Sequence, residues 1–211
     1  MTDEASWAKP IGEISGAAGH LEGRRLTGPQ QGFGQLWQKT YRVTIPGHTP
    51  EEVVETWKAE YGDFWPRHSK FNAPLAGIKP GEVGSIDSMQ VLSTGVMVMY
   101  ADTTSFAFMT PEGHPFSGWI TFSAEAIEGG TQAQVQLLIR ASDPLYEVAM
   151  AFGMGKGEDA MWRHVLQSLA KRHGVAVKAT QDLVKVDRKR LWDNAGNWKR
   201  NAVFTRGRKR A

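Results

Sequence analysis

Apolar and polar residues alternate along several short segments of the chain, a pattern typical of half-buried β-strands. In residues 131–141, glutamines occupy one face and the other carries Ala133, Val135, Leu137 and Ile139. Similar segments, joined by connections of hairpin length, predict strands at 36–45, 82–92, 94–101, 105–110, 116–126 and 131–141, with one turn at 93–95. Connections this short exclude the crossovers that parallel strands need, so the predicted sheet is antiparallel.

Two other segments have the apolar spacing of amphipathic helices. The first opens at Thr49-Pro50-Glu51-Glu52, where Thr49 is the predicted N-cap and Glu52 completes a capping box. The second is a long C-terminal helix over 158–173, which the glycines at 153–157 separate from a helical start at Asp143. Its apolar stripe consists of Trp162, Val165, Leu166 and Leu169. We predict that this stripe packs on Ile120, Phe122, Val135, Leu137 and Ile139.

The order of these elements predicts an α+β fold. A strand and a helix precede a meander of strands, and a long helix follows. A curved antiparallel β-sheet wrapped around the C-terminal helix satisfies that order with short connections. The chain then divides into a flexible N-terminal leader (1–32), a domain of this fold (33–174) and a C-terminal extension (175–211).

Charge is distributed unevenly between the domain and the extension. Residues 1–174 hold 14 Lys and Arg against 19 Asp and Glu, whereas residues 175–211 hold 11 Lys and Arg against 3 Asp. We predict that 175–204 is partly ordered on the domain, anchored by Trp192 and Trp198, and that 205–211 is free to make a weak contact with an anionic surface. The composition predicts no specific nucleic-acid binding.

Several kinds of site and segment are not expected, because the sequence lacks the residues or patterns that they need. There is no cysteine, which excludes a disulfide scaffold and thiolate metal sites. The six histidines have no metal-ligand spacing, so we expect no metal and no cofactor. The longest apolar stretch, 96–101, is far shorter than the roughly 20 residues of a spanning helix. No apolar run follows the early acidic residues, so we expect no secretory signal and a cytoplasmic location.

Several stretches carry a family resemblance. They read GFGQLWQKTYRV (32–43), STGVMVMYAD (93–102), FMTPEGHPFSGWITFSA (108–124), LLIRASDPLYE (137–147) and WDNAGNWKRNAVF (192–204). They resemble a bacterial branch of the SRPBCC superfamily, also called START/Bet v 1-like or polyketide cyclase/dehydrase-like. The resemblance implies a helix-grip fold with a cavity between sheet and helix that holds a hydrophobic small molecule. It transfers no catalytic residue, because the superfamily has no universal catalytic set.

Methionine and aromatic side chains are the candidate lining of that cavity. Methionine is an adaptable filler of irregular apolar space. The predicted ligand-binding residues are Trp65, Met97, Met99, Phe106, Phe108 and Trp162. Residues 96–100 are apolar on both faces, so a shift of one residue places Val98 and Tyr100 on the cavity side instead. The alternative is a methionine-rich core without a cavity.

Three functions remain open at this stage. The first is carriage or sensing of a hydrophobic small molecule, without catalysis. The second is a cyclase, dehydratase or hydrolase, which needs polar groups that converge in the cavity; the candidates are His68, Asp87, Glu112, His114 and Arg140. The third is binding of an anionic polymer or membrane surface through the extension. The sequence leaves the ligand and the oligomeric state open.

Overall fold

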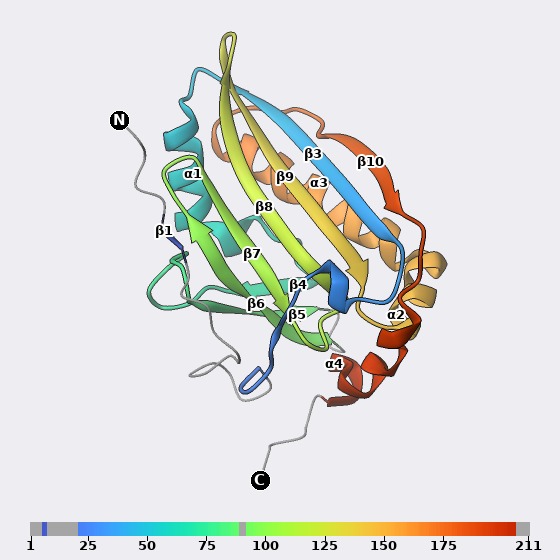
Figure 1. Ribbon diagram of the computed structural model, residues 1–211. Coiled ribbons are helices and arrows are strands. Elements are labelled where there is room, and N and C mark those ends of the chain that lie inside the picture. The colour runs from blue at the N-terminus through green and yellow to red at the C-terminus, as the bar shows by residue number, and fades with distance from the viewer. Residues whose placement is uncertain (1–5, 8–20, 89–91, 206–211) are drawn as a thin grey trace.

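One antiparallel sheet dominates the fold (Figure 1). The computed structural model of the chain describes residues 6–7, 21–88 and 92–205. Among these residues the strands follow the order β10-β3-β9-β8-β7-β6-β5-β4, and two short strands extend it, β1 beside β6 and β2 beside β7. Their bounds are β1 (Ser6–Trp7), β2 (Leu26–Thr27), β3 (Leu36–Pro46), β4 (Ser69–Asn72), β5 (Val83–Ser88), β6 (Leu92–Ala101), β7 (Ser105–Pro111), β8 (Phe116–Ile127), β9 (Gly130–Ala141) and β10 (Thr180–Asp187).

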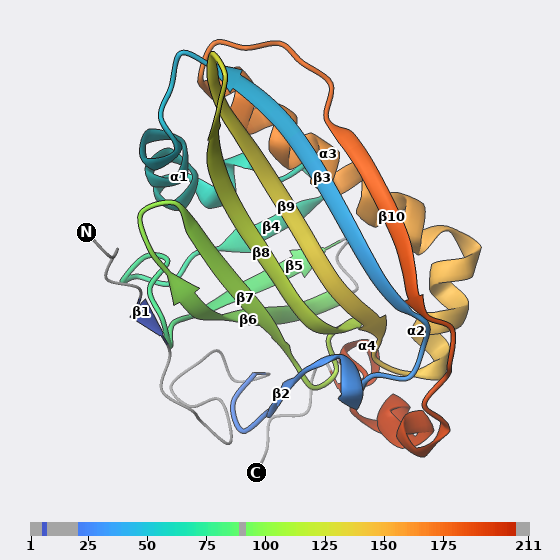
Figure 2. The ribbon, with the colours of Figure 1, turned by 45° about the horizontal axis from the view of Figure 1, so that its top comes forward.

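The main helices, α1 and α3, pack on the same face of the sheet (Figures 1 and 2). The helical segments are η1 (Pro29–Gln31), α1 (Pro50–Ala59), η2 (Tyr61–Phe64), α2 (Pro144–Ala149), η3 (Met150–Met154), α3 (Gly155–Arg172), η4 (Trp192–Arg200) and α4 (Ala202–Thr205). The predicted capping box at α1 is confirmed: Thr49 Oγ1 accepts from the Glu52 N–H at 3.3 Å, and Glu52 Oε2 accepts from the Thr49 N–H at 3.0 Å. The arrangement is the predicted α+β helix grip.

The core lies between the concave face of the sheet and these two helices. The predicted stripe of α3 and its predicted partners on β8 and β9 are all buried in one apolar cluster. On α1 the buried side chains are Val53, Val54 and Trp57. Each fully buried side chain of this size stabilises the fold by about 1.5–3 kcal/mol relative to exposure. Burial of this stripe therefore holds α3 on the sheet.

The turn predicted at 93–95 is wrong, because these residues lie inside β6. Thr94 pairs with Ile86, and Gly95 pairs with Ser85. A Cβ on Gly95 would lie 2.5 Å from Gly84 O and 2.6 Å from Leu21 Cδ1. Glycine is needed there for close approach of another segment and not for a turn.

Two strands of the main path, β4 and β10, were not predicted. Most side chains of β10 are exposed, so it has no buried face and no clear alternation of apolar and polar residues. It pairs with the edge of β3, with Gln181 opposite Tyr41 and Leu183 opposite Lys39. The sheet thus continues past residue 174, where we expected the extension to begin.

Part of the expected flexible leader packs against the sheet. Leu21 is buried beside Met97, and the Thr27 hydroxyl donates to Thr110 O at 3.1 Å. Residues 1–5 and 8–20 of the leader lie outside the described part of the chain. Within the described part, the leader therefore covers the convex face near β6 and β7.

Beyond β10, the extension is held mainly by asparagine side chains. Trp192 and Trp198 remain 70% and 48% exposed, so anchoring by burial of both indoles is wrong, although the Trp192 ring meets Phe33 edge to face at 5.1 Å. Asn194 Nδ2 donates to Gln30 O and Gly32 O, and Asn197 Nδ2 donates to Gln31 O and Ser142 O, all at 2.7–2.9 Å. An amide that donates to two backbone carbonyls fixes position more specifically than an indole on a surface does. Residues 206–211 are outside the described chain.

Candidate functional site

Aromatic rings fill the centre of the space between sheet and helices. Phe106 and Phe122 stack with ring centroids 4.6 Å apart, and Tyr61 meets both Phe108 and Phe122 edge to face at 5.3 Å. Trp57 also meets Phe122 edge to face at 5.3 Å. Such offset and perpendicular pairs each add about 0.5–1.5 kcal/mol beyond the burial of their area. The site expected to hold a ligand is thus lined by closely packed rings.

Two tryptophans stand at the side of this aromatic group. The ring centroid of Trp162, on α3, lies 5.7 Å from that of Phe122. The ring centroid of Trp65, at the end of η2, lies 6.2 Å from that of Trp162. Trp65 is half-buried, so it reaches from the interior to the surface. Deeper inside, Trp57 is fully buried, and its indole Nε1–H has no hydrogen-bond acceptor among the described residues. A buried donor without an acceptor is uncommon, and a functional role is one of the ordinary reasons for it.

The structure brings together four of the six residues predicted to bind the ligand. Trp65, Phe106, Phe108 and Trp162 all belong to the concave-face cluster, whose rings are in contact. Whether they touch a ligand stays a prediction.

Met97 and Met99 lie on the opposite face of the sheet, so their predicted placement is wrong. They pack with Leu21, Leu26 and Val83. The inward residues of β6 are Val96 and Val98. A strand that is apolar on both faces does not reveal which face is inside, and here both faces are covered.

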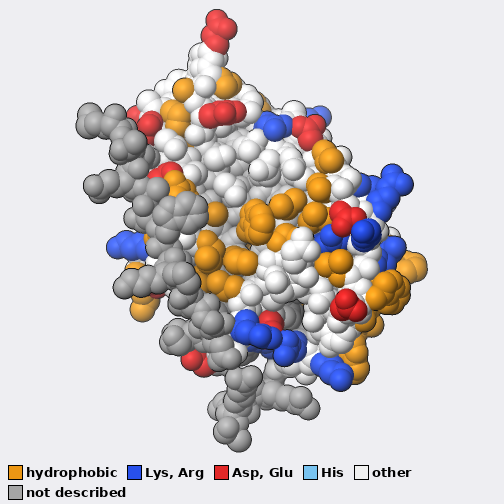
Figure 3. Space-filling model, viewed as in Figure 1, with side chains coloured by type: hydrophobic (Ala, Val, Ile, Leu, Met, Phe, Trp, Pro, Cys, Tyr) orange, Lys and Arg blue, Asp and Glu red, His pale blue; other side chains and the backbone are white. Residues whose placement is uncertain are grey.

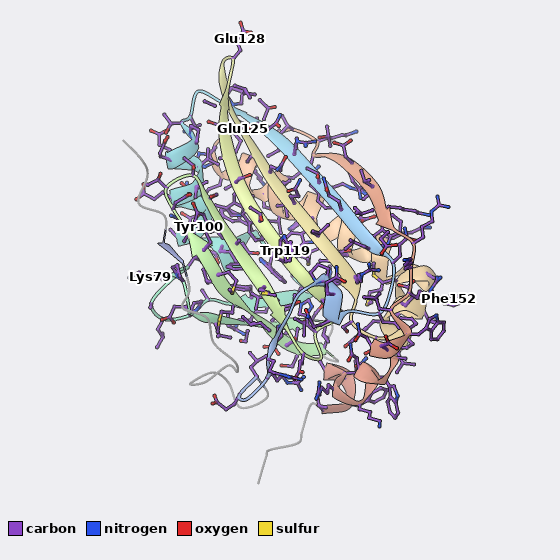
Figure 4. The ribbon with its side chains drawn as sticks, viewed as in Figure 1. Lys79, Tyr100, Trp119, Glu125, Glu128 and Phe152 are labelled. Carbon is purple, nitrogen blue, oxygen red and sulfur yellow. The ribbon has the colours of Figure 1, made fainter. Side chains whose placement is uncertain are left out.

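The alternative register, in which Val98 and Tyr100 face the cavity, is right for Val98 and wrong for Tyr100. Val98 faces the core, but the pairing of β6 with β7 shifts between Val98 and Tyr100. Beyond this irregularity Ala101 packs against the core, while the hydroxyl of Tyr100 donates to Asp102. Figure 4 marks Tyr100 on the sheet. A β-bulge of this kind inserts one residue and reverses the facing of all that follow.

A cluster of charged side chains lies between β3 and α3, beside the aromatic group. Lys39 Nζ donates to Glu158 Oε2 at 2.6 Å and to Asp159 Oδ1 at 2.7 Å. The Tyr41 hydroxyl donates to the same Asp159 oxygen at 2.7 Å, and Trp162 Nε1 donates to Glu158 Oε1 at 3.4 Å. Lys39 and Glu158 are almost fully buried. Trp162 therefore joins the charged cluster to the aromatic rings.

The surroundings shift the pKa values of the two carboxyl groups of this cluster in opposite directions. Burial raises the pKa of Glu158, and Lys39 offsets that effect only in part. Burial also opposes ionisation of Asp159, but hydrogen bonds from Lys39 and Tyr41 outweigh it and lower the pKa of that carboxyl. Lys39 therefore favours the ionised form of both carboxyls, and it offsets the effect of burial more completely at Asp159 than at Glu158. The cluster places charged hydrogen-bonding groups beside the aromatic rings.

Sequence reasoning missed this cluster, although part of the signal was present. Lys39 has the inward parity of Tyr41 and Val43, and Glu158 precedes Trp162 by one helical turn. A charged residue in register with an apolar face is buried only if a partner neutralises it. That partner comes from a segment more than a hundred residues away, which the local pattern does not reveal.

The five polar residues proposed for an enzyme do not converge. His68 and Asp87 are exposed, and Glu112 pairs with Arg25 and Arg200 near the surface. Buried His114 hydrogen-bonds the backbone of Phe116. Buried Arg140 donates to Gly34 O, Lys189 O and Asp187 Oδ2. No shared catalytic pocket forms from this set.

Neither a metal cluster nor a membrane-spanning helix occurs in the described ranges. No three His, Cys, Asp or Glu side chains of 6–7, 21–88 and 92–205 are grouped so that they hold a metal ion. In the same ranges no helix is long and apolar enough to cross a membrane.

The fold is similar to that of several solved structures. No protein-family model matches the chain, and no curated protein matches its sequence. The protein TTHA0849 from Thermus thermophilus superposes with a TM-score of 0.51 at 14% identity, over 64% of this chain and 96% of that one. Protein Ms6760 from Mycobacterium smegmatis gives 0.47 at 11% identity, over 64% and 89%. Ara h 8.0201 gives 0.44 at 11% identity, over 64% and 96%.

At these identities the likeness establishes the fold and not the activity. The chain therefore has a helix-grip fold, in which a curved antiparallel sheet wraps around a long C-terminal helix.

Proposed function

We propose that the protein binds a hydrophobic small molecule between the concave face of the sheet and α3, as a carrier or sensor. The observation that carries this proposal is the Nε1–H of Trp57, a buried donor among aromatic rings that has no acceptor in the described chain. A ligand with an apolar body and one acceptor oxygen satisfies both the rings and this donor. Pockets for small molecules commonly combine an apolar lining with a few polar groups in this way.

The proposed lining differs from the one expected from sequence. It keeps Trp65, Phe106, Phe108 and Trp162, omits the two methionines and adds Val98. Because the rings are packed against one another, a ligand must move some of them to enter. Trp65 is half-buried and follows η2, so we propose that its displacement admits the ligand.

Native mass spectrometry of the protein purified from its own host tests the proposal. We expect a co-purified apolar molecule that is released by organic solvent. Binding of the probe 1-anilinonaphthalene-8-sulfonate is then compared between Phe108→Leu, on the concave face, and the matched control Met99→Leu, on the convex face. We expect Phe108→Leu alone to change the affinity. No co-purified molecule together with equal effects of both substitutions would overturn the proposal.

A second candidate, contact with an anionic lipid surface, is favoured by exposed apolar side chains at one corner of the molecule. There α2 lies beside η4 in both ribbon views, and Phe152 projects at the edge (Figures 1, 2 and 4). The exposed apolar residues are Leu145, Val148, Phe152, Trp192, Trp198, Val203 and Phe204. Basic residues of the extension accompany them: Arg188, Lys189, Arg190 and Lys199. Aromatic and basic side chains together suit the interface of an anionic bilayer.

Co-sedimentation with vesicles distinguishes this second candidate. We expect binding to vesicles of phosphatidylglycerol and phosphatidylcholine, weaker binding to phosphatidylcholine alone, and loss on the double change Phe152→Ser and Trp192→Ser. Leu75→Ser is the matched control, because Leu75 is a fully exposed leucine in the connection between β4 and β5. Equal binding of both variants would argue against a lipid contact at this corner.

A further inference from the structure

A pocket with both polar and apolar walls lies on the convex face of the sheet, away from the site proposed above. Its volume is about 440 Å³, within the range of small-molecule sites. Figure 3 shows a hollow on this face with basic side chains and an acidic one beside it. Three segments that are distant in sequence build the pocket together with Ser142: 25–31 of the leader, 109–117 around the β7–β8 turn, and 194–200 of η4. It shares no residue with the aromatic group.

Two arginines stand at this pocket with a single carboxylate between them. Glu112 Oε1 accepts from Arg25 Nη2 at 3.0 Å and from Arg200 Nη1 at 2.6 Å. The side chain of Glu112 is 14% exposed, whereas those of Arg25 and Arg200 are 59% and 54% exposed. A third guanidinium, that of Arg24, lies beside them and donates to Glu112 O and to Arg200 O, so positive groups outnumber the carboxylate here. The guanidinium groups of Arg25 and Arg200 each have five N–H donors, so both keep donors that Glu112 does not use.

The polar wall of the pocket supplies further hydrogen-bonding groups in fixed positions. Both N–H groups of the Asn194 and Asn197 amides are used on backbone carbonyls, which holds these side chains in place and leaves their Oδ1 atoms as acceptors. Two nearly buried serines, Ser117 and Ser142, also line it, and the Ser142 hydroxyl has no partner in the described chain. The same amides that attach η4 to the domain therefore give this wall of the pocket a fixed geometry.

We propose that this pocket binds a small organic anion, with Arg25 and Arg200 on its carboxylate or phosphate group. Guanidinium groups suit both, because their paired N–H donors match the oxygens of either anion. Hydroxyl or amine groups elsewhere on the ligand donate to the Asn194 and Asn197 oxygens. Glu112 holds the two arginines together in the free protein and competes with the ligand for them.

Because Glu112 competes with the ligand, substitutions of Arg25 and of Glu112 should change the anion affinity in opposite directions. Arg25→Gln removes one guanidinium and lowers the local charge by one unit, so anion affinity falls by about tenfold. Glu112→Gln removes the competing carboxylate and raises the local charge by one unit, so anion affinity rises. Arg172→Gln is the matched control. Arg172 is an exposed arginine on α3 that pairs with Glu60, and it does not line this pocket.

Isothermal titration of the full chain measures these effects with benzoate, inorganic phosphate and the neutral benzamide as probes. We expect saturable binding of at least one anion and none of benzamide. Preference for benzoate or for phosphate then identifies the carboxylate or the phosphate class as the ligand. The proposal is overturned if neither anion binds saturably, if Arg25→Gln and Arg172→Gln weaken binding equally, or if Glu112→Gln weakens it as Arg25→Gln does. Thermal melting of each variant establishes that the fold is retained.

Discussion

Lys39 Nζ lies 2.6 Å from Glu158 Oε2, and both side chains are almost inaccessible to solvent. The pair joins strand β3 to the first turn of α3, at the edge of the aromatic group. A buried ion pair offsets the loss of hydration only while both partners are present. This contact therefore ties the start of α3 to one register on the sheet.

Removing the lysine from this pair should destabilise the protein strongly. Lys39→Met leaves the buried carboxyl of Glu158 and the half-buried carboxyl of Asp159 without their ammonium partner, so we expect the free energy of unfolding to fall by about 3–5 kcal/mol. Urea denaturation measures this. The double change Lys39→Met and Glu158→Gln should recover part of the loss, because one buried charge is gone. A double variant no more stable than Lys39→Met would contradict this account.

Truncation of the α3 stripe should also be costly. Leu166 is fully buried between α3 and the sheet, so Leu166→Ala should lower the free energy of unfolding by about 2–5 kcal/mol through lost burial and an incompletely filled cavity. Leu183→Ala, on exposed β10, is the control and should change it by less than about 0.5 kcal/mol. Similar values for both variants would mean that α3 does not close the core.

Stability should fall in mild acid because of His114. Burial lowers the pKa of this side chain to about 4, although a hydrogen bond with Phe116 partly opposes the shift. The unfolded chain takes up a proton at about pH 6.5, whereas the folded one stays neutral down to about pH 4. The unfolded state thus binds more protons within that window, and stability is lost as the pH falls through it, by about 1.4 kcal/mol per pH unit.

Urea denaturation at about pH 7 and about pH 5 measures this loss, expected to be about 2 kcal/mol. The variant His114→Gln should show a smaller difference between the two pH values, whereas exposed His68→Gln should behave as the unmodified chain does. An unchanged pH dependence in His114→Gln would show that other groups dominate acid destabilisation.

The attachment of the extension should depend on Asn201. This buried amide donates from Nδ2 to Asp143 Oδ2 at 2.8 Å, while the other oxygen of Asp143 caps α2. Asn201→Ala leaves a buried carboxylate oxygen unpaired, so we expect a loss of about 1–3 kcal/mol in the free energy of unfolding. Asn72→Ala removes a similar but more exposed amide contact on β4 and should cost much less. Equal effects would indicate that the extension is held elsewhere.

Local patterns in the sequence were sufficient for most of the architecture. The alternation in 131–141 predicted β9, and the residues around Thr49 predicted the start of α1. Both are determined by neighbours within a few residues, through strand facing and helix capping, so they can be seen in the sequence alone. The stripe of α3 similarly identified the side chains that close the core.

Only the tertiary structure decided what depends on distant partners. Met97 and Val98 are equally apolar, and the convex side can hold Met97 because a leader segment covers it there with Leu21. Strand β10 has no buried face, and it forms because β3 offers an unpaired edge. Lys39 is stable in the interior because folding places Glu158 beside it, 119 positions away. Burial and charge compensation are properties of the folded neighbourhood, so a local pattern shows which side chains are suited to the interior but not which partners they meet there.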